Sequence, residues 1–153
     1  LRGSFIEELR SRGDLEPAEL VRRAARLGCD LSRGVVALCA ELATERPRHV
    51  VATISGDYPG ALAQHVEGSA PRVYALLPAE GGDGAPERVL GRARSLAERL
   101  GRHGTVGLSS FYADPADLGR AIQEAELVLD VDVDLAVGER RPHQSRGAVG
   151  EGE

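Results

Sequence analysis

The chain lacks lysine, methionine and tryptophan altogether, and all 19 of its basic residues are arginine. Without lysine it can form no Schiff base through an ε-amino group, and it has no lysine for a phosphate-binding loop. The use of arginine alone fits a GC-rich bacterial coding sequence. Because the chain begins with Leu1 and contains no methionine, we expect it to be a piece of a longer protein.

Long hydrophobic runs are also missing. A run such as GVVALCAEL at 34–42 is far too short to cross a bilayer, and no charged-then-apolar leader opens the chain. We therefore expect a cytoplasmic protein with no membrane partner. At 153 residues, with 42% hydrophobic and 28% charged residues, the chain is typical of one globular domain that can bury a core.

No segment carries enough positive charge to bind DNA. The net charge is −5, with seven arginines against six acids in residues 1–34, nine against twelve in 35–129 and three against six in 130–153. A DNA-binding surface needs a stripe of cations that neutralises several phosphates. This chain alone is therefore not expected to bind DNA.

The two cysteines do not form a metal or redox motif. Cys29 and Cys39 stand ten residues apart, with no CxxC spacing and no histidine at ligand spacing. The pattern indicates two reduced thiols. We predict no metal and no cofactor, and the sequence assigns no cofactor-binding residue.

Hydrophobic periodicity, glycine and proline predict the element order α-α-β-α-β-β-α-β-α. The helices are predicted to begin at Ser4, Pro17, Pro47, Pro86 and Asp114. The strands are predicted at 34–42, 60–66, 72–78 and 105–110. The side chains expected on inward helix faces are Leu20, Ala24 and Leu27; Val50, Val51 and Ile54; Val89, Ala93, Leu96 and Leu100; and Leu118, Ile122, Ala125 and Leu129.

The central βαββαβ order predicts an α/β (α+β) fold with a ferredoxin-like antiparallel sheet, an N-terminal helical preamble and an additional C-terminal helix. Strands 35–42 and 72–78 should form the middle pair. We divide the chain into a helical segment at 1–33, a domain at 34–130 and a disordered tail at 131–153. The tail is predicted because its sequence is rich in glycine, arginine and glutamate and lacks periodicity.

No set of side chains predicts a catalytic or metal site. The candidates are Ser109 and Ser110; His49, His65 and His103; Asp114 and Asp117; and Asp130, Asp132 and Asp134. GLSSF is not a Gly-x-Ser-x-Gly nucleophile elbow, and the histidines fall on separate elements. The first acidic pair suits a helix cap, whereas the alternating acids lack the glycine turn and final glutamate of a calcium loop. We interpret those alternating acids as a charged, frayed end.

From about Ser4 to Asp130 the chain resembles the central region of bacterial PucR/CdaR-type transcriptional regulators. The resemblance is carried by AARLGCDLSRGVVALCAEL, RVYALLP and GTVGLSSFYADPADLGRAIQEAELVL. That region is described as a GGDEF-like domain, similar in fold to the catalytic domain of diguanylate cyclases. The resemblance also implies that full-length members end in a DNA-binding helix-turn-helix domain, and we expect none in residues 131–153.

The resemblance further implies where a nucleotide site would lie. In the cyclases the signature occupies the hairpin turn, which reads GSAPR at 68–72 here, so the Gly-Gly-Asp of AEGGDG at 79–84 falls in a connector instead. Pro71 and Arg72 stand where acids are needed, and Glu41, at the end of the first strand, is expected to be a lone solvated carboxylate. Metal-assisted phosphoryl chemistry needs several carboxylates, so we expect no catalysis.

We therefore predict a non-catalytic regulatory or interaction domain that self-associates or packs against neighbouring domains. Two alternatives stay open: a degenerate guanine-nucleotide binder, and a sensor that holds a small-molecule effector against the sheet. DNA is expected as a partner only through a helix-turn-helix domain outside this chain.

Overall fold

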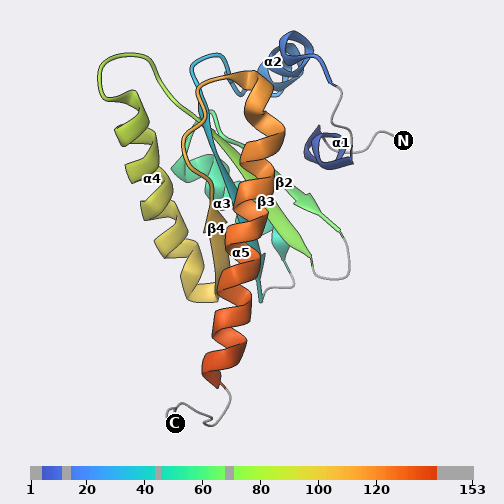
Figure 1. Cartoon of the computed structure of the whole chain (residues 1–153), viewed down its shortest axis with the longest axis vertical. Coiled ribbons are helices and arrows are strands. Elements are labelled where there is room, and N and C mark those ends of the chain that lie inside the picture. The colour runs from blue at the N-terminus through green and yellow to red at the C-terminus, as the bar shows by residue number, and fades with distance from the viewer. Residues whose placement is uncertain (1–4, 12–14, 44–45, 68–70, 141–153) are drawn as a thin grey trace.

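A four-stranded antiparallel sheet runs through the molecule in the order β2-β3-β1-β4 (Figure 1). The computed structural model describes residues 5–11, 15–43, 46–67 and 71–140, without the side chains of 133–140. The strands are β1 Val35–Leu42, β2 Leu62–Val66, β3 Arg72–Pro78 and β4 Gly104–Leu108. The predicted α+β class and the predicted middle pair are both confirmed.

Helices cover both faces of the sheet (Figure 1). One face carries α3 Pro47–Asp57 and α4 Ala85–Leu100, and the other carries α1 Phe5–Ser11, α2 Pro17–Arg26 and α5 Leu118–Arg140. Two 3₁₀ turns, η1 Gly101–His103 and η2 Pro115–Asp117, precede β4 and α5. None of these helices, over the described part of the chain, is long and apolar enough to cross a bilayer.

The alternation of side chains along β1 divides the core into two halves. The odd-numbered residues from Val35 to Cys39 face α1, α2 and α5, and the even-numbered residues from Val36 to Ala40 face α3 and α4. Each of these residues is at most 1% exposed. Burial on both faces explains why this stretch reads as an unbroken apolar run.

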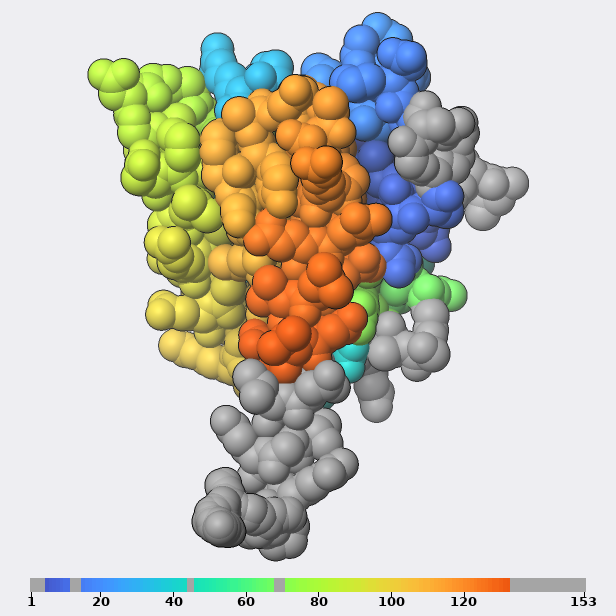
Figure 2. All heavy atoms as spheres, viewed as in Figure 1, coloured from blue at the N-terminus to red at the C-terminus, as the bar shows by residue number. Residues whose placement is uncertain are grey.

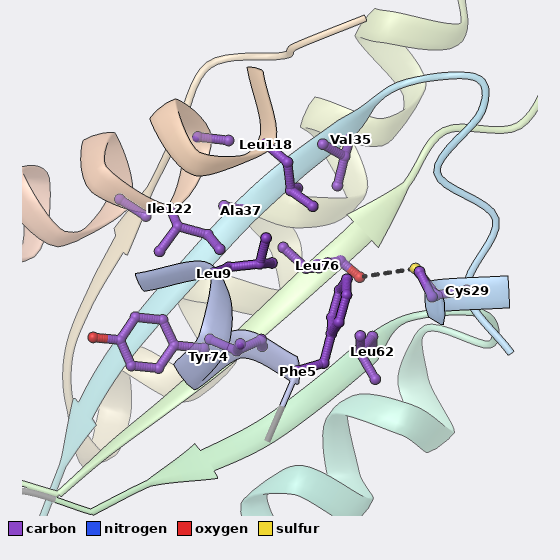
Figure 3. Packing of buried hydrophobic residues seen from close by; sticks show 14 of the residues in the cluster. Phe5, Leu9, Cys29, Val35, Ala37, Leu62, Tyr74, Leu76, Leu118 and Ile122 are labelled. Atoms are coloured by element: carbon purple, nitrogen blue, oxygen red, sulfur yellow. Dashed lines mark hydrogen bonds between the residues drawn. The ribbon is translucent and has the colours of Figure 1, made fainter. Parts of the chain in front are cut away.

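The half of the core beneath α5 is closed by α1. Figure 3 shows Phe5 and Leu9 of α1 beside Leu76 of β3, with Ile122 of α5 across from them. Ser4, which was predicted to cap α1, lies outside the described residues.

The inward stripes predicted for the two long helices are confirmed. In α4 the buried residues are Val89, Ala93, Leu96 and Leu100, and in α5 they include Leu118, Ile122, Ala125 and Leu129. The predicted cap is also present, because a side-chain oxygen of Asp114 accepts a hydrogen bond from the Ala116 N–H at 2.9 Å.

Two predictions about helix ends are wrong. Helix α5 continues to Arg140, so residues 131–140 are helical and not part of a disordered tail. The reason is that neither glycine nor proline interrupts residues 120–137. Leu27 was predicted on the inward face of α2, but it is 52% exposed. The helix ends at Arg26, so the side chain of Leu27 no longer follows the inward face. Residues 141–153 lie outside the described residues.

Candidate functional site

Glu41, the acid at the end of β1, is held by an arginine from the neighbouring strand. Arg72 begins β3 one position beyond the Ala40–Val73 pair, which sets it opposite Glu41. Its Nε donates to Oε1 of Glu41 at 3.2 Å, and its Nη2 donates to Oδ1 of Asp130 on α5 at 2.9 Å. The prediction of a lone solvated carboxylate is therefore wrong, because the Glu41 side chain is paired and only 32% exposed.

A second arginine joins the same face of the sheet to α5. Arg10 of α1 donates through Nε to Oε2 of Glu126 at 2.7 Å, and the hydroxyl of Tyr74 donates to the same oxygen at 2.5 Å. The Arg10 guanidinium carbon lies 5.2 Å from the centre of the Tyr74 ring, within range of a cation–π attraction. Glu126 thus joins α1, β3 and α5.

These two clusters line one open hollow beside α5, which we call the α5 hollow. Its volume is about 420 Å³, and its lining residues are Arg10, Arg72, Gln123, Glu126, Leu127 and Asp130. Figure 2 shows that α5 lies on the outside of the molecule along this face. Two arginines meet two carboxylates in the lining, so the charge of the hollow is balanced without a ligand.

Burial and ion pairing both act on protonation in this network. Burial is the strongest single influence on Arg72 and would lower its pKa, but the bond to Asp130 and the interactions with Tyr74 and Cys39 together outweigh it and hold the pKa above its ordinary value. Burial, followed by the hydrogen bond to Glu126, raises the pKa of Tyr74 well above 10.0. Both groups therefore keep their protons at neutral pH, and both act as donors.

This arrangement does not suit a divalent metal. Mg²⁺ and Ca²⁺ need several oxygens that are free to coordinate, whereas Glu41, Glu126 and Asp130 each accept a bond from an arginine. Over the described ranges, no three His, Cys, Asp or Glu side chains are grouped so that they could hold an ion. The network links four elements and offers no open coordination position.

The hairpin turn that the resemblance assigns to the signature falls only partly within the described residues. Gly68, Ser69 and Ala70 lie outside them. Pro71 is exposed, and Arg72 is committed to the carboxylates of Glu41 and Asp130. The described part of the turn therefore contributes an arginine, not an acid, to this end of the sheet.

The Gly-Gly-Asp triplet lies in the connector between β3 and α4, as predicted. Gly82 and Gly84 have φ angles of 104° and 75°, a region that favours glycine. Arg88 of α4 donates from Nη2 to the Gly81 carbonyl at 3.1 Å and from Nη1 to the Asp83 carbonyl. The triplet shapes a turn that one arginine closes.

The serines after β4 have structural partners. Ser109 is 4% exposed; its Oγ accepts from the Ala37 N–H at 2.9 Å and donates to the Ser110 carbonyl at 2.7 Å. The hydroxyls of Ser110 and Tyr112 donate to Glu124 of α5 at 2.8 and 2.7 Å. These bonds fix the crossing from β4 to α5 and leave no activated nucleophile.

The three histidines lie on three elements. His65 lies on β2, but His49 at the start of α3 and His103 in η1 line one hollow between α3 and α4. The prediction that the three histidines fall on separate elements is confirmed. The start of α3 and the end of α4 lie at the same end of the sheet, so two of these elements contribute a histidine to one hollow.

The acidic candidates have different surroundings and do not form one group. The Asp117 carboxylate lies 3.8 Å from the Arg120 guanidinium in the first turns before and within α5. Asp130 belongs to the Arg72 network, so the prediction of a frayed end is wrong for this residue. Asp132 is exposed, and the side chain of Asp134 lies outside the described residues.

Both cysteines are free and fully buried. Burial raises the pKa of Cys29 to about 12 and that of Cys39 to about 11. Figure 3 shows the Cys29 sulfur directed at the Leu76 carbonyl oxygen, 4.0 Å away. Such thiols stay neutral and shielded, as expected for inert core residues.

The sequence did not predict the arginine network: Glu41, Arg72 and Asp130 were named one by one, and Arg10, Tyr74 and Glu126 were not named. Arg10 and Glu126 are 116 positions apart, so no local pattern links them. A partial signal did exist: Glu126 and Asp130 share a helix face, and Arg72 and Tyr74 share a strand face. Only the packing of α5 against β3 brings the two pairs together.

Comparison with known families matches most of the chain. The family model described as a GGDEF-like domain matches residues 12–131. This range includes all four strands and ends within α5. No curated protein matches the chain.

Proposed function

Because the chain belongs to the GGDEF-like domain family, we propose that it is a non-catalytic regulatory and interaction domain of a PucR/CdaR-type transcriptional regulator. The finer assignment is supported by the stretches RVYALLP and GTVGLSSFYADPADLGRAIQEAELVL, which resemble that group. In this proposal any contact with DNA is made by a helix-turn-helix domain outside the described residues.

The observation that carries the proposal is the double ion pair of Arg72. At the end of the sheet where a cyclase gathers carboxylates around metal, this arginine binds Glu41 and Asp130. A metal would have to displace a cation that already holds two carboxylates and would lie beside its positive charge. The same pairs tie β1 and β3 to α5, which suits a rigid scaffold.

The outer side of α5 supports a role in interaction. Leu127 and Val131 are 65% and 56% exposed, four positions apart and on one helix face. Along with Leu27, they are the exposed large hydrophobic residues of the described chain. Leu127 also lines the α5 hollow. Exposed apolar residues with a polar surround are typical of a surface that packs against a second protein.

Calorimetry with GTP, with and without magnesium, tests the non-catalytic part. We expect no magnesium-dependent heat at millimolar nucleotide and no turnover. The matched variant is Arg72→Ala, which frees Glu41 and Asp130; magnesium-dependent binding by this variant alone would support the blocking role of Arg72. Magnesium-dependent binding by the unaltered chain contradicts the proposal and favours the degenerate nucleotide binder.

A further inference from the structure

The hollow between α3 and α4, which we call the α3–α4 hollow, lies on the sheet face opposite the arginine network. It has a volume of about 420 Å³, within the range of small-molecule sites. It forms because α3 begins and α4 ends at the same end of the sheet, the end where β1 finishes (Figure 1). Nothing in the proposed function uses this hollow.

The interior wall of the α3–α4 hollow is apolar. Leu96 and Leu100 of α4 are buried members of the core, and Val50 of α3 is a half-buried neighbour. Ala43, just after β1, completes this wall. A ligand that occupies the hollow therefore removes apolar surface from water, which favours a molecule with an apolar body.

The rim of the hollow is basic. Arg99 and Arg102 line it together with His49 and His103, and Asp57 is the acid among the lining residues. Asp57 is paired with Arg99 at 3.1 Å. No ion pair to Arg102 occurs in the portion of the chain that is described, so its cation faces the hollow without a carboxylate partner.

The start of α3 adds to this positive character. His49 and Val50 lie in its first turn, and no side chain caps the helix at Arg46. The N–H groups of a first helical turn and the helix dipole both favour an anion. The carboxyl end of α4, which carries the negative end of that helix's dipole, lies at the same region. The positive charges of Arg99 and Arg102 offset this negative end.

The Arg99–Asp57 pair also limits the length of the hollow. Both residues line a smaller neighbouring hollow that continues toward Tyr58 and Arg92, so the pair lies between the two spaces. At the other end η1 supplies Arg102 and His103. A bounded space of this kind fits a compact molecule better than a helix or an extended peptide.

We propose that the α3–α4 hollow binds a small organic anion, a carboxylate or phosphate ester with an apolar body. Arg102 and His103 hold the anionic group at the rim, and Leu96, Leu100 and Val50 contact the body of the molecule. This inference is independent of the regulator assignment, because it rests on the lining of the hollow alone.

Fluorescence titration of the full chain with 8-anilinonaphthalene-1-sulfonate tests the proposal, since this probe joins an aromatic body to an anion. We expect saturable binding that Arg102→Ala weakens about tenfold or more, because a charge-assisted bond is lost. Thr53→Trp, which fills the hollow from α3, should abolish binding. The matched control is Arg94→Ala on α4, outside the hollow, which should bind as the unaltered chain does. Circular dichroism confirms that each variant is folded.

Competition distinguishes the possible ligands. Displacement by benzoate indicates a carboxylate, and stronger displacement by phenyl phosphate indicates a phosphate ester. Equal displacement by inorganic phosphate overturns the apolar part of the proposal. Equal binding by all variants, or no binding by the unaltered chain, overturns the site itself. If probe binding falls as protein concentration rises, and Arg102→Ala reverses the fall, a second copy fills the hollow and the proposal is wrong.

Discussion

Arg72 is the residue on which the character of the site depends. Its side chain is 22% exposed, and it bonds to acids from a strand and a helix that are 89 positions apart in the chain (Glu41 and Asp130). Asp130 is about half exposed, so water screens its pair with Arg72 and limits the contribution of that pair to stability. The Glu41 side chain is less exposed, and its pair with Arg72 is less screened. Arg72 therefore acts both as a structural link and as a block to metal binding.

Replacing Arg72 by methionine should lower the free energy of unfolding by about 1–2 kcal/mol. The apolar stem is kept, so the loss reports the two charge-assisted bonds. Urea denaturation measures it. Arg94→Met, at an exposed position of α4, is the control and should change stability by less than about 0.5 kcal/mol. Equal stability of the two variants would show that the network contributes nothing.

The buried thiols give a pH-dependent prediction. The pKa of each rises from 9.0 on folding, to about 12 for Cys29 and about 11 for Cys39. The stabilising difference is therefore fully present below pH 9 and is lost as the pH rises toward these values. We expect the urea midpoint to be constant from pH 7 to about pH 8.5 and to fall at higher pH.

The same burial predicts chemical shielding. At pH 8 neither cysteine should react with 5,5′-dithiobis(2-nitrobenzoate) in the folded chain, and two thiols per chain should react in urea. Fast reaction of the folded protein would contradict the burial of Cys29 and Cys39.

At the scale of elements, β4 and α5 approach each other closely at Gly107. A Cβ added at Gly107 would meet the Ala125 carbonyl oxygen and would lie 2.5 Å from the Leu129 nitrogen. Both contacts are backbone atoms, which cannot turn aside. The glycine therefore sets the distance at which α5 lies over the sheet. This distance also determines whether Asp130 of α5 can pair with Arg72 of β3.

Gly107→Ala should destabilise the protein by about 2–4 kcal/mol, because α5 has to move away from β4. Gly91→Ala is the matched control: it lies within α4, and an added Cβ there meets nothing within 4 Å. That variant should gain about 0.5–1 kcal/mol from the higher helix propensity of alanine. Thermal and urea unfolding measure both, and effects of the same sign would refute this account.

At the scale of the whole molecule, the two helical faces differ in charge. Helices α3 and α4 with η1 contain six arginines against three acids. Helix α5 on the other face is acidic, with Glu124, Glu126, Asp130 and Asp132 among its residues. The acidic side carries the exposed Leu127 and Val131. We expect self-association to involve this side, because burying those side chains is favourable and no other exposed pair of large hydrophobic residues occurs on a described helix.

Sedimentation velocity over a range of concentrations tests this surface. If the chain self-associates, Leu127→Glu should shift it toward the monomer, because the new charge would be buried in the contact. Leu27→Glu is the matched control, since Leu27 is similarly exposed but lies at the end of α2. A dimer that is lost in Leu27→Glu and kept in Leu127→Glu would place the contact elsewhere.

The order of the elements, the central pair of strands and the inward faces of α4 and α5 could all be predicted from the sequence. These features depend on local periodicity and on glycine and proline, whose effects act within a few residues. The sequence also showed that the Gly-Gly-Asp triplet is a connector, since it follows the predicted hairpin. It failed at the end of α5, where Val131 to Val137 read as irregular chain although nothing in that stretch breaks a helix.

The partners of the polar side chains, in contrast, depend on how the elements pack together. Glu41, Arg72 and Asp130 meet because β1 and β3 pair and α5 crosses them. His49 and His103 line the same hollow because α3 begins near the place where α4 ends. Contacts between side chains so far apart in the chain depend on strand register and on the depth of helix packing. Neither leaves a periodic trace in the sequence, and for that physical reason the core was predictable and the site was not.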